Sequence, residues 1–235
     1  METHDFRRTT PRRGFIGTLA TGAAATLGMA TLVNPLQLNA QQNSGDASDA
    51  DEWFKKIKGK HRIMFDVTAP NGIMPFAWSK VFLLTNAATG TPEADSSVVV
   101  ILRHEAIPYA LNNDVWGKYK LGEMFKINDE KIKSGAVANP FWQRPADTVP
   151  GIGNVDIGID TLQKSGVMFA ACDMALTVYS AVAAGAMGSN ADPAAIKKEW
   201  TAGVLPGVQV VPSGVWAVGR AQEHGCAYCF AGGAM

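Results

Sequence analysis

The stretch from Ser97 to Leu102 reads SVVVIL, and every side chain after the first is a branched aliphatic one. Such a run is typical of a central strand in a parallel sheet, because that strand is buried on both faces and needs no alternate polar positions. Other apolar runs of strand length recur along the chain, separated by longer segments of helical composition. This alternation predicts an α/β domain with a mainly parallel sheet of about five strands.

The remaining elements are predicted from the same alternation. We expect four further strands, at residues 61–67, 167–172, 208–211 and 227–230. We expect helices at residues 75–88, 174–187 and 215–224, and a shorter one that begins at Asp192-Pro193. Pro75 suits the first turn of a helix and Ser213 suits an N-cap, which indicates where the first and last of these helices begin.

The pattern breaks down between the second and third predicted strands. The segment from about residue 113 to residue 154 is rich in proline and glycine, so we expect an irregular insert there. It also carries five large aromatic side chains, Trp116, Tyr119, Phe125, Phe141 and Trp142. Long loops of this kind are usually functional when they are ordered. We therefore expect the insert to cover a pocket or to contact a neighbouring subunit.

The first forty residues have the order of an export signal: a basic start, a weakly apolar segment at residues 15–33, and a small-residue cleavage site that ends at Ala40. Arg12 and Arg13, followed by Phe15, resemble the twin-arginine signal that sends folded proteins across a bacterial inner membrane. The resemblance implies the Tat translocase as a transient partner, cleavage near Ala40 and a periplasmic location. The alternative is a permanent anchor at residues 15–33, which the glycine and threonine content disfavours.

The mature chain is expected to be one domain. Residues 41–52 are mostly small and polar and predict a flexible linker, and residues 53–235 suffice for a single core. Residues 1–40 hold four of the 21 basic and two of the 21 acidic residues, which leaves 17 against 19 and a net charge of −2. That charge does not favour binding to nucleic acid. The chain has no Gly-x-Gly-x-x-Gly, Walker-type or Gly-x-Ser-x-Gly motif in a suitable place, so no organic cofactor is predicted.

Three segments of this domain together resemble the DsrE/DsrF-like family. They are Val98–Leu111 (VVVILRHEAIPYAL), Leu162–Cys172 (LQKSGVMFAAC) and Val208–Gln222 (VQVVPSGVWAVGRAQ). The likeness covers most of residues 60–231. It implies a flavodoxin-like three-layer fold, assembly as trimers or hexamers, and a background in sulfur relay, in which some members carry a persulfide on a cysteine.

The cysteine of those sulfur-relay members falls on Cys172. The residues by themselves indicate the same position, because ligands of open α/β sheets bind beyond the carboxyl ends of the strands and a helix N-terminus stabilises a thiolate. Asp173 opposes this if its charge faces the sulfur, or it caps the helix instead. The alternative is that Cys172 is a small buried side chain that fills the junction between strand and helix.

His104 ends the neighbouring strand run, so its imidazole is expected at the same edge of the sheet. There it would act as an acid, a base or a metal ligand beside Cys172, or else as a hydrogen-bonded junction residue. Asp66 and Tyr109 are weaker candidates for the same rim.

The C-terminal segment holds His224, Cys226 and Cys229 close together. These three residues are candidate ligands for copper or zinc, although a fourth ligand is missing. Residues three apart on a strand point to opposite faces, so the two cysteines are not expected to pair with each other. A structural role and a disulfide between subunits remain as alternatives.

The function expected from these observations is an exported sulfur carrier, with a persulfide on Cys172 and His104 in support. Its partners would be a protein that donates or accepts sulfur, or a small sulfur compound, and shielding by the insert at Phe141 and Trp142 would protect the thiol in an oxidising compartment. One alternative is a non-catalytic oligomeric binding module that assembles through the insert. Another is a metal-binding protein that uses the C-terminal cysteines.

Overall fold

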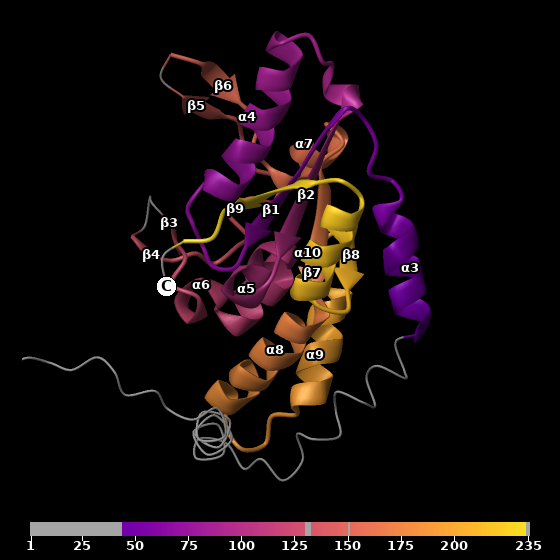
Figure 1. Ribbon diagram of the computed structural model, residues 1–235. Helices are drawn as coiled ribbons and strands as arrows, with labels where there is room; N and C mark the ends of the chain where they lie inside the picture. Colours follow the sequence, from indigo (N-terminus) through magenta and orange to yellow (C-terminus); the bar gives the residue numbers. More distant parts are fainter. Residues whose placement is uncertain (1–43, 130–132, 150, 234–235) are drawn as a thin grey trace, which may run out of the picture. The chain divides into compact units, whose positions relative to one another are not determined.

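A computed structural model describes residues 44–129, 133–149 and 151–233 of the chain (Figure 1). The predicted export-signal residues Arg12, Arg13, Phe15 and Ala40 lie outside this described part. No helix among the described residues combines the length and the apolar character that crossing a membrane requires.

Five parallel strands form the central sheet, as the apolar runs predict. In chain order they are β1 (His61–Val67), β2 (Ser96–Leu102), β7 (Met168–Cys172), β8 (Val208–Val211) and β9 (Ala227–Phe230). Their order across the sheet is β8-β7-β2-β1-β9 (Figure 1). The predicted flavodoxin-like α/β fold with a parallel sheet is therefore confirmed.

β2 separates the two halves of the hydrophobic core. Val98, Val100 and Leu102 belong to the larger buried cluster, whereas Val99 and Ile101 belong to the smaller one, and none of the five is more than 1% exposed. Successive side chains of a strand point to opposite faces, so the two clusters lie on opposite sides of the sheet. The result is a three-layer arrangement with apolar residues of the helices on both faces.

The two layers of helices differ in size. The larger cluster contains buried residues of α4 (Met74–Ala88), α7 (Ile159–Lys164), α8 (Asp173–Met187) and α9 (Pro193–Ala202). The smaller cluster contains those of α3 (Ser44–Phe54) and α10 (Gly214–Glu223). The predicted helices at 75–88, 174–187 and 215–224 thus appear within one residue of their expected ends. Ser213 caps α10 as predicted, accepting a hydrogen bond from Trp216 N–H. The short helix predicted to begin at Asp192-Pro193 is α9, and Asp192 caps it by accepting a hydrogen bond from Ala194 N–H.

The flexible linker expected through residue 52 is not what the structure shows, because α3 already begins at Ser44. The compact unit that contains the sheet accordingly starts at Gly45. Ala50 and Phe54 are fully buried in the smaller cluster, and Trp53 is only 7% exposed. Polar composition concealed this helix, since it needs only a few apolar residues on one face to cover the sheet beside α10.

The insert is more regular than its proline and glycine content predicts. It contains α5 (Asn113–Tyr119), α6 (Leu121–Met124) and two small hairpins, β3 (Asn128–Asp129) with β4 (Ser134–Gly135) and β5 (Asp147–Val149) with β6 (Gly153–Val155). Its aromatic side chains complete the larger core cluster. Trp116 is fully buried and donates its Nε1–H to the carbonyl of Pro108 at 2.8 Å, and Phe141 stacks on Phe76 with ring centroids 4.1 Å apart.

The packing of α3 predicts a large loss of stability when Phe54 is truncated. Its ring lies 4.9 Å from that of Trp53 and 5.8 Å from that of Trp216, centroid to centroid. Phe54→Ala should lower the free energy of unfolding by about 3–5 kcal/mol, measured by chemical denaturation of a chain that begins at residue 41. Val137→Ala, at a side chain 69% exposed, is the control and should change it by less than about 0.5 kcal/mol. A loss below about 1 kcal/mol for Phe54→Ala would mean that α3 does not pack on the sheet.

Candidate functional site

The connections after β7 and β8 leave the sheet on opposite faces. β7 leads into α8, whose buried residues belong to the larger cluster, whereas β8 leads into α10, whose buried residues belong to the smaller one. Where neighbouring parallel strands diverge in this way, a crevice opens beyond their carboxyl ends, and it is the usual ligand site of open α/β sheets. The strand order therefore predicts a site between the ends of β7 and β8.

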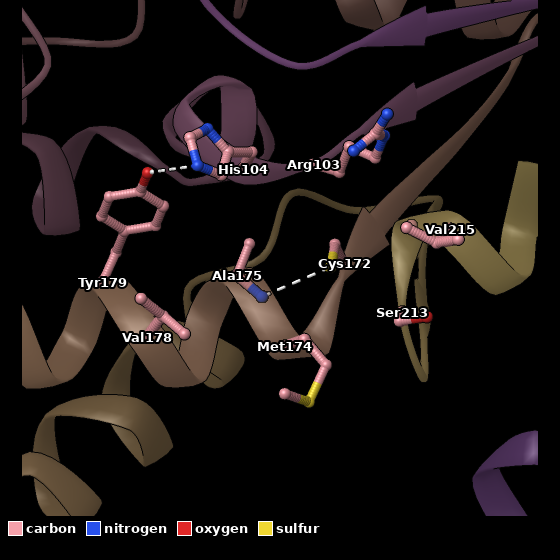
Figure 2. Close-up of a pocket in the computed structure, with 10 residues that line it drawn as sticks. Arg103, His104, Cys172, Met174, Ala175, Val178, Tyr179, Ser213 and Val215 are labelled. Carbon is pink, nitrogen blue, oxygen red and sulfur yellow. Dashed lines mark hydrogen bonds between the residues drawn. The ribbon is translucent and has the colours of Figure 1, made fainter. Parts of the chain in front are cut away.

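A cavity of about 290 Å³ lies at this place (Figure 2). One wall is formed by Arg103 and His104, which follow β2, and a second by Cys172 and the first two turns of α8. The third wall is the start of α10, at residues 213–215. Apart from the polar groups of these walls the lining is aliphatic, so the site suits a small ligand that reacts with or hydrogen-bonds to a few defined groups.

Cys172 lies where the sequence predicts it, at the carboxyl end of β7. Its side chain is the N-cap of α8, and Sγ accepts a hydrogen bond from Ala175 N–H at 3.3 Å (Figure 2). The residue is 6% exposed and lines the cavity. An N–H group of the first helical turn stabilises a thiolate more than a thiol, because the anion is the stronger acceptor.

Asp173 does not cap α8, because Cys172 occupies that position. Its carboxylate instead receives Lys197 Nζ of α9 at 2.9 Å, and the residue is 9% exposed. The negative charge that would oppose a thiolate at Cys172 is thus matched by a lysine on the neighbouring helix.

His104 lies just beyond the strand, as the first residue of η3 (His104–Ala110). Its backbone adopts a left-handed conformation with φ of +50°, which is uncommon for a residue with a side chain. The imidazole is exposed, and its Nε2 is 3.5 Å from the hydroxyl of Tyr179 (Figure 2). Burial raises the pKa of Tyr179 to about 12, so this phenol is protonated at neutral pH and is able to donate to His104.

Arg103 is the site residue that sequence reasoning missed. It donates Nε–H to Asp66 Oδ1 at 2.6 Å and Nη2–H to Asp66 Oδ2 at 2.9 Å, and Tyr228 donates its hydroxyl to the same Oδ2 at 2.9 Å. Asp66 is only 1% exposed. The hydrogen bond from Arg103 to Asp66 is the main cause that raises the pKa of Arg103. A signal was present in the sequence, because an acid and a base at the ends of two neighbouring parallel strands are brought to one edge.

The two weaker candidates do not line the cavity. Asp66 is engaged by Arg103 and Tyr228, on the side of β1. Tyr109 is 1% exposed and packs in the larger core cluster against Phe76 and Phe141, and burial raises its pKa. It is a core residue for this reason and not a rim residue.

The structure does not assemble the metal site considered at the C-terminus. Cys226 belongs to the smaller cluster and Cys229 packs against the larger one, so they occupy opposite faces of the sheet as their spacing predicts. The ring of His224 stacks on Phe54. All three cysteines of the chain are free thiols, and burial raises the pKa of Cys226 to about 11. Across residues 44–129, 133–149 and 151–233, no three His, Cys, Asp or Glu side chains are arranged to hold a metal ion.

Comparisons with known proteins add little. No family model matches the chain, and no curated protein matches it. A solved structure of a protein of unknown function, MTH1491 from Methanobacterium thermoautotrophicum, is 18% identical, and the match covers 73% of this chain and 99% of that one with a TM-score of 0.33. At that TM-score the likeness indicates nothing about the function of this chain.

The contact between Gly214 and Arg103 makes the site sensitive to a single methyl group. A Cβ on Gly214 would lie 2.4 Å from Cβ and 2.5 Å from Cδ of Arg103. Gly214→Ala should therefore displace Arg103 and lower the free energy of unfolding by about 1–3 kcal/mol, as measured by chemical denaturation. Gly219→Ala in the same helix meets nothing within 4 Å and should instead stabilise the protein by about 0.5–1 kcal/mol. Equal effects of the two substitutions would contradict the contact.

Proposed function

We propose that this protein is an exported, DsrE-like sulfur carrier that holds sulfane sulfur as a persulfide on Cys172. The observation that supports it best is the position of this thiol, at the carboxyl end of β7, capped by Ala175 N–H and open to a cavity of about 290 Å³. The cavity lies at the topological switch point of the sheet, where the connections after neighbouring strands leave on opposite faces and where open α/β sheets bind their ligands. The twin-arginine and DsrE-like resemblances of the sequence point to the same function.

The chemistry requires a nucleophilic sulfur and no external oxidant. The thiolate of Cys172 attacks the outer sulfur of a donor persulfide, R–S–SH. A new S–S bond forms to Cys172, the S–S bond of the donor breaks, and its electron pair leaves with R–S⁻. Transfer to an acceptor thiol is the same exchange in the opposite sense, as in thiol–disulfide chemistry. His104, exposed beside the cavity, is placed to supply a proton to the departing thiolate.

The thiol of Cys172 is shielded by the junction between β7 and α8 and not by the insert. Phe141, one of the two aromatic residues expected to shield it, is 3% exposed and stacks on Phe76 in the larger core cluster. The cavity walls come from α8, α10 and the residues that follow β2. Cys172 is nonetheless only 6% exposed, because the end of β7 and the first turn of α8 enclose its sulfur.

The mass of the intact protein after exposure to inorganic polysulfide tests this function. A chain that begins at residue 41 should gain one or more sulfur atoms and lose them on reduction. The Cys172→Ser variant of the same chain should not show this gain. Cys229→Ser is the matched control, because Cys229 is the most exposed of the three thiols. It should load as the wild type does. Equal loading of the wild type and Cys172→Ser would exclude Cys172 as the carrier.

The second candidate, a non-catalytic assembly module, is favoured by one observation on α4. Met74, Trp78, Val81 and Leu84 follow one another at helical spacing and are 36–44% exposed. This apolar α4 stripe faces away from the buried side of the helix, which carries Phe76 and Leu83. Apolar stripes of this kind favour contact with another protein surface. It replaces the insert as the proposed surface for self-association, since the aromatic rings of Trp116 and Phe141 are buried within the core.

A charge in the α4 stripe should weaken a trimer or hexamer. Leu84→Glu leaves the buried face of α4 intact but places a carboxylate where an apolar contact would form, so sedimentation velocity should show dissociation towards the monomer. Val137→Glu, at an exposed position outside α4, should keep the wild-type mass. A wild type that sediments as a monomer, or a Leu84→Glu variant that stays assembled, would argue against this surface.

A further inference from the structure

We propose that Arg103, held in place by Asp66 and Tyr228, is the cation that stabilises the anionic sulfur of Cys172. Sequence reasoning gave the supporting role to His104. The anionic sulfur is the thiolate of Cys172. It is also the perthiolate that sulfur loading would create there, and this second part rests on the proposed function. Asp66 and Tyr228 act through Arg103 as positioning residues.

The register of the sheet brings Arg103 and Cys172 together. Leu102 of β2 pairs with Ala171 of β7, so the next residue of each strand, Arg103 and Cys172, occupies the next position along the same ladder. Neighbouring strands are about 4.8 Å apart. Both residues line the cavity, and Figure 2 shows the side chain of Arg103 on the wall next to Cys172. Electrostatic attraction to Cys172 is among the causes that raise the pKa of Arg103, although the hydrogen bond with Asp66 is the largest of them.

The order of the strands decides which charge Cys172 meets first. Asp66 belongs to β1, and β2 lies between β1 and β7. The sequence of charges along this edge is therefore the carboxylate of Asp66, the guanidinium of Arg103 and then the sulfur of Cys172. Because the Coulomb energy falls with distance, attraction by the nearer guanidinium exceeds repulsion by the farther carboxylate.

Three contacts fix the guanidinium. Its Nε and Nη2 form a two-pronged pair with buried Asp66, which defines the plane of the group. Tyr228 donates to the carboxylate from β9. The start of α10 packs on the stem of Arg103, where Gly214 leaves no room for a Cβ. Among the described residues no hydrogen bond engages Nη1, so the donors of this nitrogen are not used by the pair with Asp66.

The other charged and titratable groups around Cys172 are already engaged. Nε2 of His104 faces the hydroxyl of Tyr179. Burial, together with the negative charge of Glu105, raises the pKa of this hydroxyl to about 12, so it is neutral at pH 7. Asp173 of α8 pairs with Lys197 of α9. The first turn of α10 carries no acidic residue. Arg103 is thus the cation of the cavity wall itself.

The rate at which neutral iodoacetamide alkylates Cys172, followed from pH 5 to pH 10 by mass spectrometry, measures the thiolate fraction. The experiment uses a Cys229→Ser background and the chain from residue 41. Removing Arg103 alone would leave Asp66 buried without a partner, so the test variant is the neutral pair Asp66→Asn with Arg103→Met. It should lower the rate at pH 7 about tenfold and raise the pH of half-maximal rate by about one unit.

Matched variants separate this role from a structural one. Arg103→Lys keeps the charge and should retain most of the rate at pH 7. Tyr228→Phe removes one hydrogen bond from a residue that is half exposed and should slow the reaction about two- to threefold. Arg220→Met removes a cation of α10 that pairs with Asp51 and Glu223 and does not line the cavity, so its rate should stay within about twofold of the background protein. Each variant is first shown by chemical denaturation to be folded.

Two results would overturn the assignment: a folded neutral pair that alkylates at the background rate, or an Arg220→Met variant that shows the same tenfold loss. Failure of the proposed function looks different. If polysulfide does not load Cys172 while alkylation still depends on Arg103, the carrier function is wrong and the charge pair stands. If loading occurs and the neutral pair Asp66→Asn with Arg103→Met leaves the alkylation profile unchanged, only the role of Arg103 is wrong.

Discussion

Burial of β2 on both faces dictates how the helices are arranged around the sheet. From Val98 to Leu102 every side chain is at most 1% exposed, and alternate residues belong to different core clusters. A strand of this kind must have a helical layer on each side. The chain covers one side with the helices between β1 and β8. It covers the other with α3, which precedes β1, and with α10, which leads from β8 to β9 at the far edge of the sheet. The cavity opens because the connections that follow β7 and β8 leave the sheet on opposite sides.

The same parallel arrangement concentrates chemistry at one edge. Asp66, Arg103 and Cys172 come at or just after the carboxyl ends of β1, β2 and β7, three strands that are neighbours in the sheet. Residues more than a hundred positions apart in the sequence are thereby aligned in the order carboxylate, guanidinium, sulfur. A thiolate in this place has both a helical N–H group and a fixed cation nearby, which are two of the means by which proteins stabilise reactive cysteines.

Two segments outside the sheet, α3 and the insert, contribute buried side chains to the core although their composition does not indicate it. α3 looks like a polar leader, yet Ala50 and Phe54 are fully buried. The insert looks like a lid, yet its rings Trp116 and Phe141 pack inside the larger cluster. In both cases a few apolar side chains decide the outcome, because the free energy gained depends on the apolar area removed from water and not on the average polarity of the segment.

Local patterns in the amino-acid sequence predict the strands and helices and the edge of the sheet at which the cavity lies. Strands at 61–67, 208–211 and 227–230 have the predicted bounds, and Cys172 is at the predicted junction, because burial on two faces and helix caps leave a direct mark on neighbouring residues. That His104 faces Tyr179, that Asp173 pairs with Lys197 and that Arg103 and Cys172 line one cavity became visible only in the folded chain. Those pairings depend on strand order and register, and side chains that meet across strands are distant in the chain, where no local pattern records which of them will be neighbours.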